Sequence, residues 1–368
     1  MGILVIEKQD LKHNIEQIKK YAKSCNENLK IIAVVKSNGY GLGLKEYSNF
    51  LIDNGIDFLA VASVDESVKL REYGIKEEIL MMSSTAIRED IQKMVENDIT
   101  ITIGSKESKE MLIDVLKNIN KKPKVHIKID TGFGRYGYLY TDIERIIEDI
   151  KELQQFCEIE GIFSHFSTSF YKEKWTRLQF ERYTEVLKIL EKNNINIPIK
   201  HIGNSSSFIR FPEMDLNAVR IGSAFLGRIA VQNNLGLKRI GYLESEISEI
   251  KELPKGWNIG YSNTYRTKRK TKIALVPMGY AEGYHMKLES DMLSFKNKVR
   301  DVIRAIKRLF KDTKLYVEIN DKKYPILGRI GMYHVTVDIT GEDLKIGAIV
   351  KMNANPLYVD SSVRRLYK

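Results

Sequence analysis

Eight short apolar runs, rich in β-branched residues, recur through the first 225 residues of the chain. Amphipathic segments with apolar residues at helical spacing separate them, such as SVDESVKLREYG and SKESKEMLIDVLKNI. Strands that alternate with helices favour parallel pairing, and near-continuous apolar strands fit a sheet covered on both faces. Since eight β/α units close a barrel, the pattern predicts an α/β fold with an N-terminal (β/α)8 TIM-type barrel rather than a doubly wound open sheet. The runs are 31–36, 57–63, 78–83, 99–103, 125–130, 159–165, 197–203 and 217–223.

The pattern changes after about residue 235. Runs such as KIALVPM, KLYVEI and HVTVDIT are typical of strands, and turn-prone tracts such as NDKK and TGED punctuate them, mostly without helices. We therefore predict that a C-terminal mostly-β domain follows the barrel. The predicted bounds are 8–232 for the barrel and 233–368 for the β-rich domain, which residues 1–7 are expected to join as a strand.

Composition is that of an ordinary soluble globular protein, with 43% hydrophobic and 29% charged residues. No run approaches the roughly 18 apolar residues that a membrane span needs, and the first residues lack the pattern of a signal peptide. Two cysteines, Cys25 and Cys157, are too few for a disulfide framework in a chain of this length. We expect a cytoplasmic protein, without membrane contact unless the chain is an excised part of a membrane-anchored protein.

Part of the net charge of +11 lies in one segment, residues 294–314. Apolar residues recur there at helical spacing with basic residues between them, which predicts a basic amphipathic helix. We interpret it first as a helix that packs on its own domain with a solvated basic face. A membrane surface or a nucleic acid is the alternative contact for this helix, although no nucleic-acid partner is expected for the chain. The apolar positions are Phe295, Val299, Val302, Ile306, Leu309 and Phe310.

Polar and basic side chains stand at the predicted strand ends, where barrels of this type carry their chemistry. No pair of carboxylates and no His, Asp and Glu cluster with metal-ligand spacing occurs among them. No metal site is therefore expected, and metal-assisted hydrolysis and two-carboxylate glycosidase chemistry are disfavoured. The residues are Lys36, Tyr40, Asp130, Arg135, His165, His201, Asn204, Ser205, Arg220 and Ser223.

Lys36 lies in AVVKSNGYGLG, where a glycine-rich tract follows an apolar run. It could be a nucleophile, a phosphate ligand or an ordinary strand-end lysine. A phosphate-loop lysine follows its glycines, whereas Lys36 precedes them. A desolvated lysine can form a Schiff base, and Gly- and Ser-rich ends of late barrel strands suit a phosphate. Together these features suggest a phosphorylated aldehyde cofactor, of which pyridoxal phosphate (PLP) is the obvious candidate.

Eight tracts, in order over nearly the whole chain, resemble the motifs of the alanine racemase family of PLP-dependent, fold-type III enzymes. Any one of these tracts would be a weak signal, and their order along the chain is what makes the resemblance specific. They are AVVKSNGYGLG, HIKIDTGFGRYGY, GIFSHFS, HIGNSSS, AVRIGSAFLG, NIGYSNTY, VPMGYAEGY and ILGRIGMYHVTVDIT.

The resemblance implies roles for individual residues. Lys36 would be the Schiff-base lysine and one catalytic base, and Tyr261 the second base. His165 would assist Tyr261, and Arg220 would contact the pyridine nitrogen. Lys128 stands where some members of the family carry a carbamylated lysine. The implied cofactor contacts are Lys36, Tyr40, Arg135, Asn204, Ser205, Arg220, Gly222 and Ser223, and the implied substrate contacts are Arg135, Tyr280 and Met332.

The resemblance also implies an activity and a partner. The expected enzyme is an isomerase that interconverts L- and D-alanine by a two-base mechanism and supplies the D-amino acid for cell-wall peptidoglycan. In this family the second base reaches the cofactor of the other subunit, so a head-to-tail homodimer with shared active sites is expected.

Departures from the family's motifs leave the amino acid open. Gly331 and Tyr333 flank Met332 where the family has Cys and Asp, Glu282 replaces an Asp, and Leu42 replaces a His. Ser361 aligns with a tyrosine that crowds the substrate. A serine racemase or a racemase of broader specificity is therefore the alternative. From other classes, a non-catalytic PLP-binding barrel and a fold-type III decarboxylase stay open, although the decarboxylase would need an acidic residue where Arg220 stands.

Overall fold

The structure is a computed structural model that describes residues 2–287, 295–310 and 314–368. The chain divides into two compact units. One is Lys8–Ile240, and the other joins Met1–Glu7 to Gly241–Lys368. Each unit is described by itself below.

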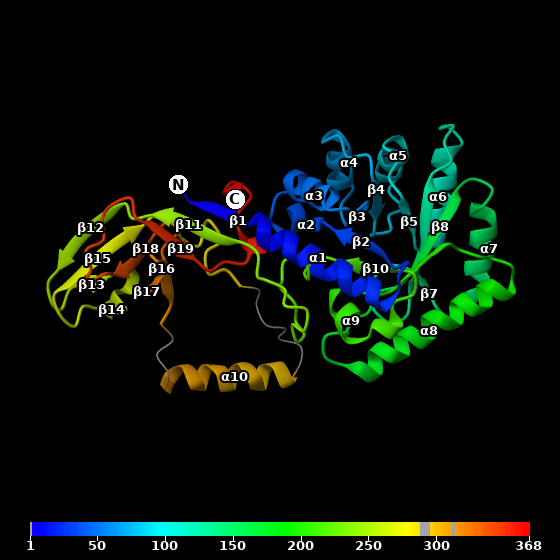
Figure 1. The fold of residues 1–368 in the computed structure, drawn as a ribbon. Helices are drawn as coiled ribbons and strands as arrows, with labels where there is room; N and C mark the ends of the chain where they lie inside the picture. The colour runs from blue at the N-terminus through cyan, green and yellow to red at the C-terminus, as the bar shows by residue number, and fades with distance from the viewer. Residues whose placement is uncertain (1, 288–294, 311–313) are drawn as a thin grey trace. The chain divides into compact units, whose positions relative to one another are not determined.

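The unit Lys8–Ile240 is a nearly closed barrel of eight parallel strands, which confirms the predicted fold class (Figure 1). The strand order is β4-β3-β2-β10-β9-β8-β6-β5, and a single parallel bridge joins Leu80 of β4 to Thr100, the residue before β5. A short strand, β7 (Tyr138–Leu139), pairs with β6 outside this path. The barrel strands are β2 (Lys30–Val34), β3 (Phe58–Val61), β4 (Glu78–Met81), β5 (Ile101–Ile103), β6 (Lys124–Asp130), β8 (Glu158–Phe163), β9 (Ile199–His201) and β10 (Ala218–Ile221).

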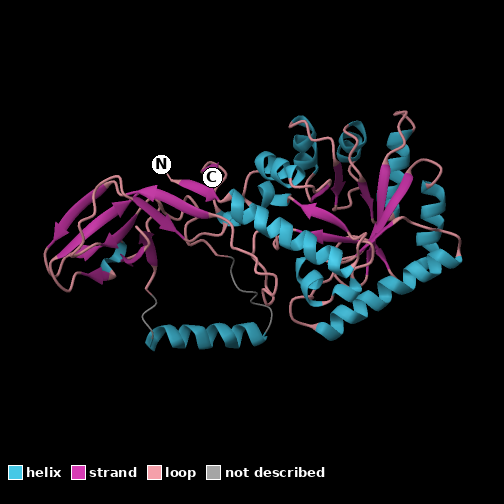
Figure 2. Cartoon of the chain, viewed as in Figure 1, coloured by secondary structure: helices cyan, strands magenta, loops and turns pink. Residues whose placement is uncertain are grey.

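Helices connect the barrel strands and cover their outer faces (Figure 2). In the first of them, Leu11, Ile15 and Ile18 are buried at helical spacing, so its apolar stripe packs inward. Ser105 begins another with a capping box, in which its hydroxyl accepts a hydrogen bond from the backbone of Ser108. The elements are α1 (Lys8–Cys25), α2 (Lys36–Tyr40), α3 (Leu44–Asp53), α4 (Val64–Glu72), α5 (Arg88–Glu96), α6 (Lys106–Leu116), α7 (Ile143–Leu153), α8 (Glu173–Lys192), α9 (Ser205–Arg210) and the 3-10 turn η1 (Pro212–Met214).

The barrel interior is partly polar. Lys124, His126 and Lys128 alternate along β6 and so share one face of the strand. Their side chains bond to residues of β4, β8 and β9 or just beyond them, which identifies this face as the interior. The barrel therefore holds a line of ionisable groups that leads from the start of β6 towards the ends of the strands.

The other unit is mostly β. Its nine-stranded sheet has the order β12-β15-β18-β17-β16-β19-β11-β1-β20, and β13 and β14 form a separate hairpin. The N-terminal strand lies inside this sheet, antiparallel to β11 and parallel to β20, with Ile3 opposite Glu244 and Arg364. The strands are β1 (Ile3–Ile6), β11 (Tyr242–Glu246), β12 (Glu249–Leu253), β13 (Asn258–Ile259), β14 (Tyr265–Arg266), β15 (Thr271–Val276), β16 (Tyr316–Ile319), β17 (Lys322–Leu327), β18 (Val335–Asp338), β19 (Ile349–Met352) and β20 (Arg364–Tyr367), with 3-10 turns η2 (Tyr261–Asn263) and η3 (Pro356–Tyr358).

The predicted basic helix is present as α10 (Phe295–Phe310). Ser294, residues 311–313 and the side chains of Leu309 and Phe310, which belonged to the prediction, lie outside what the structure describes. The expectation that its apolar face packs on its own domain is wrong for the described side chains, because Val299, Val302 and Ile306 are exposed. Among the helices of the described residues, none has the length and apolar content to cross a membrane.

Candidate active site

A cavity of about 340 Å³ lies at the ends of the barrel strands. Its volume is in the range of sites that hold small molecules. Residues from the ends of β2, β6, β8, β9 and β10 line it, so segments far apart in the sequence meet there. Of the residues singled out at the strand ends, Asp130 and His201 do not line this cavity. The structure brings together all the barrel residues to which the resemblance gave a role: Lys36, Tyr40, Lys128, Arg135, His165, Asn204, Ser205, Arg220, Gly222 and Ser223.

The short segment α2, which follows β2, is a left-handed turn and not a regular helix. Ser37, Asn38, Gly39 and Tyr40 have φ angles of 56°, 53°, 62° and 52°. The predicted first strand, 31–36, therefore ends earlier, at Val34, and Lys36 begins this turn instead of closing the strand. A left-handed conformation costs about 1–2 kcal/mol for each non-glycine residue, so surrounding contacts must hold it in place.

Side-chain hydrogen bonds provide two of those contacts. Glu66 on α4 accepts a hydrogen bond from the backbone N–H of Asn38 at 2.8 Å. The Asn38 side chain in turn accepts one from the N–H of Leu44, at the start of α3, also at 2.8 Å. The turn is thus fixed at both sides, and it directs Lys36 and Tyr40 to the same cavity.

The environment of Lys36 favours a neutral amine. Burial lowers the pKa of Lys36, and the nearby cations Arg135 and Arg220 lower it further, while Glu66 opposes them. A lysine with a lowered pKa is a better nucleophile and base near neutral pH, because more of it is unprotonated.

Hydroxyl groups and closely packed backbone also line the cavity. A Cβ at Gly222 would lie 2.5 Å from the Tyr40 hydroxyl, so only glycine allows this approach. Burial raises the pKa of Tyr40 to about 12, which keeps its hydroxyl a hydrogen-bond donor. Ser205 accepts hydrogen bonds from the N–H groups of Gly222 at 3.1 Å and Ala224 at 3.3 Å. Because the Ser205 oxygen accepts both bonds, its hydroxyl proton is left to donate. Together with the Tyr40 hydroxyl, it suits an anion such as a phosphate.

Asn204 contributes mainly to the geometry of the segment that carries Ser205. Its side-chain oxygen accepts hydrogen bonds from the N–H groups of Ser206 and Ser207 and so caps α9. The hydroxyl of Ser169 donates a third hydrogen bond to the same oxygen, at 3.0 Å.

Arg220 is buried and held by several acceptors. It donates to His201 Nδ1 at 2.5 Å, to His165 Nδ1 at 3.0 Å and to the carbonyl of Ser164 at 2.7 Å. Burial and the charge of Arg135 lower the pKa of Arg220 to about 10, so it stays cationic at neutral pH. Burial and the same two arginines keep the pKa of His165 well below its usual value, so the imidazole that faces Arg220 is neutral.

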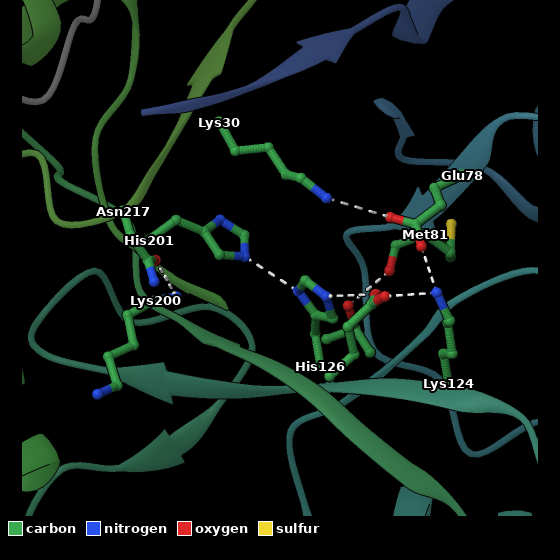
Figure 3. Close-up of polar contacts among 10 residues, drawn as sticks. Lys30, Glu78, Met81, Lys124, His126, Lys200, His201 and Asn217 are labelled. Carbon is green, nitrogen blue, oxygen red and sulfur yellow. Dashed lines mark hydrogen bonds and ion pairs between the residues drawn. The ribbon is translucent and has the colours of Figure 1, made fainter. Parts of the chain in front are cut away.

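A hydrogen-bonded chain runs from Arg220 through the barrel interior. His201 Nε2 lies 3.0 Å from His126 Nδ1, and His126 Nε2 lies 3.2 Å from Glu160. Figure 3 shows the rings of His201 and His126 pointing toward each other, with Lys124 beyond them. Lys124 bonds to both Glu160 and Glu78, and an ion pair joins Glu78 to Lys30.

The donor in each of these bonds follows from Arg220, whose nitrogens can only donate. His201 Nδ1 must accept, so its Nε2 carries the proton and donates to His126, which donates in turn to the Glu160 carboxylate. Burial raises the pKa of Glu160, but hydrogen bonds from His126 and Lys124 outweigh it and lower this pKa to about 2. The buried positive charge of Arg220 is thereby linked through two neutral imidazoles to a carboxylate. His126 and Glu160 were not predicted from the sequence, although polar residues alternate with apolar ones in KVHIKID.

These two imidazoles should make the stability of the folded barrel sensitive to acid. His126 and His201 are fully buried, and burial lowers both pKa values. The unfolded chain, with histidine pKa values of about 6.5, therefore binds more protons below that pH, and stability is lost as the pH falls through this range. We expect these two groups to lower the free energy of unfolding by roughly 2–3 kcal/mol per pH unit below pH 6.5. His165, whose pKa is also lowered, acts in the same direction.

Urea unfolding at several pH values measures this slope. In a Trp257→Phe background, the fluorescence of Trp175 on α8 reports on the barrel, since the chain has two tryptophans. The exposed His334 provides the matched control, and His334→Asn should leave the slope unchanged. A stability that is flat between pH 7 and pH 5 would contradict the neutral, buried imidazoles.

Asp130 organises the loop that carries Arg135. Its carboxylate accepts hydrogen bonds from four successive backbone N–H groups, at residues 132–135, over 2.8–3.2 Å. The carboxylate is therefore committed to the loop. Arg135 itself is exposed at the cavity, and its guanidinium stacks over Phe133 at 4.3 Å.

Lys128 on β6 is an unusual amine. It donates to the carbonyl of Met82 at 2.9 Å and lies over the ring of Phe163 at 4.9 Å. Burial and the charges of Arg220 and Arg135 lower its pKa to about 7. A large part of it is therefore neutral near pH 7, which is the reactive form of an amine.

The remaining predicted residues lie in the β-rich unit and are exposed. Tyr261 stands in η2 with 73% of its surface accessible, and Tyr280 and Met332 are about half exposed. Backbone hydrogen bonds from Tyr280 to Gly331 and from Ala281 to Met332 join the two tracts that carry these side chains. Tyr280 and Met332 therefore belong to one local surface.

No metal centre is evident in the part of the chain that the structure describes. No group of three or more His, Cys, Asp or Glu residues there is arranged to hold a metal ion.

Two family models match consecutive parts of the chain. The model described as "Alanine racemase, N-terminal domain" matches residues 6–230, and "Alanine racemase, C-terminal domain" matches residues 240–357. Among curated proteins, "Alanine racemase 2" of Caldanaerobacter subterraneus subsp. tengcongensis is 36% identical over 91% of this chain and 81% of its own length. "Alanine racemase" of Methanococcus maripaludis is 35% identical over 94% and 87%. Among solved structures, alanine racemase from Clostridium difficile 630 is 27% identical and covers 100% of this chain and 95% of its own, with a TM-score of 0.87.

Proposed function

Because the chain belongs to the alanine racemase family of isomerases, we propose that it interconverts L- and D-alanine with PLP as its cofactor. The observation that carries this proposal is one cavity that joins a lysine of lowered pKa, a buried arginine and a cluster of hydroxyl groups. We further propose that the enzyme is cytoplasmic and that its D-alanine serves cell-wall peptidoglycan.

The donors at the cavity fit PLP. Lys36 would hold the aldehyde carbon, while Tyr40, Ser205, Gly222 and Ser223 would hold the phosphate. Arg220 would contact the pyridine nitrogen, and Arg135 and Asn204 would complete the site. When bound, PLP supplies an electron sink that stabilises negative charge at the substrate α-carbon.

Arg220 would limit the strength of that sink. A guanidinium donates a hydrogen bond but does not give up its proton, so the ring nitrogen it faces stays largely unprotonated. Its link to Glu160 through His201 and His126 keeps the guanidinium oriented. A weaker sink favours return of a proton to the α-carbon over side reactions such as transamination. It also argues against a fold-type III decarboxylase, in which an acidic partner is expected at this nitrogen.

Two bases on opposite faces of the substrate would move the α-proton. Lys36 serves the D-face and Tyr261 the L-face. A phenol is a poor base without help from its neighbours. We assign that help to His165, whose Nδ1 accepts from Arg220 at 3.0 Å and whose Nε2 is therefore the protonated nitrogen.

The measurement that decides the substrate is kcat/KM for L-alanine, L-serine, L-lysine and L-ornithine with the PLP-loaded enzyme. We expect the highest value for L-alanine, because alanine is the substrate named in the curated relatives. A higher value for L-serine would select the serine racemase alternative, to which Ser361 and Glu282 point. Racemisation of none of the four, with PLP bound, would favour a non-catalytic PLP-binding barrel.

We propose a head-to-tail homodimer in which Tyr261, Tyr280 and Met332 complete the site of the partner subunit. The exposure of these three side chains supports the homodimer. Tyr261, with 73% of its surface accessible, lacks the desolvated surroundings that a catalytic base requires.

Lys128, with a pKa of about 7, is the residue we propose to be carbamylated.

Mixing two inactive chains tests the shared sites. Lys36→Ala and Tyr261→Ala chains should each be inactive alone. In a hybrid dimer, one of the two sites would receive both wild-type residues, so activity should recover to at most about a quarter of the wild-type value after random exchange. Mixing two preparations of the Lys36→Ala chain is the control. No recovery, with subunit exchange verified by differently tagged chains, would show that each site is built within one chain.

A further inference from the structure

Helix α10 exposes a continuous apolar face. Phe295 is 77% accessible, Val302 58% and Ile306 50%. Val299 and Ile303, also exposed, fall on the same side, because residues three or four positions apart share one face of a helix. An exposed apolar stripe of this kind marks a surface that contacts something other than water.

Basic residues border this face on both sides. At 100° per residue, Lys298 lies along one edge of the stripe and Lys307 and Arg300 along the other, while Arg304 stands on the opposite face. Residues 295–310 contain six lysines or arginines and one acid, Asp301, which pairs with Arg304 at 3.2 Å. The charges around the apolar stripe are therefore almost all positive.

We propose that α10 is a membrane-surface helix that binds anionic lipids. Its apolar side chains would enter the boundary between headgroups and acyl chains, and its lysines and arginines would contact the lipid phosphates. Sixteen residues make a helix of about 24 Å, too short and too charged to cross the bilayer, so it lies in the plane of the surface.

Other partners fit these features less well. A nucleic acid would engage the cations but leave the apolar stripe in water. A groove on a protein would cover the stripe, but it does not require cations along both edges. An anionic bilayer satisfies both at once, because its headgroups surround the apolar interior on every side of the helix. This inference is independent of the chemistry at the barrel cavity, and it revises the expectation that the protein makes no membrane contact.

Sedimentation of the full-length protein with lipid vesicles tests the proposal. We expect binding to vesicles of equal parts phosphatidylglycerol and phosphatidylcholine, weakening as salt rises, and little binding to phosphatidylcholine alone. A Lys298→Gln, Arg300→Gln, Lys307→Gln variant should bind about a hundredfold more weakly, at about fivefold for each cation removed. Val302→Ser with Ile306→Ser should weaken binding at least about tenfold, through loss of apolar burial.

The matched control removes the same charge elsewhere. Lys174, Lys188 and Lys192 are exposed on α8, and their replacement with glutamine should leave vesicle binding unchanged. All these positions are on the surface and outside the cavity, so racemase activity in solution should be the same in every variant. Unchanged activity would show that each variant is folded. Wild-type protein that fails to bind the anionic vesicles at low salt would overturn the proposal, as would equal loss of binding in the α10 and α8 variants.

Discussion

Tyr261→Phe is expected to stop exchange of the α-hydrogen of L-alanine with D₂O while exchange from D-alanine continues. The phenylalanine ring fills the same space but carries no group that accepts a proton. Loss of one general base typically costs about 10²–10⁴ in rate, and racemisation in both directions should fall by that factor. Lys36, the proposed D-face base, remains in place, so removal of the proton from D-alanine should be retained. Proton NMR of each isomer in D₂O measures the two exchange rates separately.

Tyr265→Phe is the matched control for this prediction. Tyr265 lies four residues further on, in β14, and packs against the small apolar cluster of Leu253, Ile259, Ile273 and Leu327. Its replacement should leave both exchange rates near their wild-type values. If Tyr261→Phe exchanges L-alanine at full speed, Tyr261 is not the L-face base and the two-base proposal is wrong.

Lys36→Ala is expected to remove both the cofactor linkage and the activity. The visible absorbance band of lysine-linked PLP should disappear, and kcat should fall at least about a thousandfold, because the same amine is also the proposed D-face base. Since alanine leaves space where the side chain was, added methylamine should restore part of the activity, which a misfolded protein would not show. Lys45→Ala, at an exposed lysine of α3, should change neither the spectrum nor the rate. An unchanged visible band in Lys36→Ala would place the cofactor on another amine, and Lys128 would be the next candidate.

The hydrophobic pattern predicted the barrel and the meeting of its strand-end residues because both depend on a regular alternation of strands and helices. The parallel strands all end at one rim, so Lys36, His165 and Arg220 had to converge if the topology was right. The mostly-β unit could be predicted in the same way, because the alternation of strands and helices stops after about residue 235. These features are local in sequence, and local patterns are what a single chain reveals.

The features that the sequence did not reveal depend on distant partners. The left-handed turn after β2 is held in part by Glu66, 28 residues further along, and no local preference of Ser37 or Asn38 predicts that contact. His126 and Glu160 were missed because the role of a buried polar residue depends on its hydrogen-bond partners, which are distant in the sequence. The exposure of α10 was missed for a related reason, since an amphipathic pattern shows which face is apolar but not what covers it.

The left-handed turn also affects how sequence variation near Lys36 should be interpreted. Substitutions at Ser37, Asn38 or Glu66 that relax the turn would redirect Lys36 and Tyr40 without removing either side chain. In a mutational scan such variants would score as inactive although they alter no group that touches the substrate. A barrel that is folded and thermally intact can therefore carry a disabled site, and loss of function at these positions does not identify a reacting group.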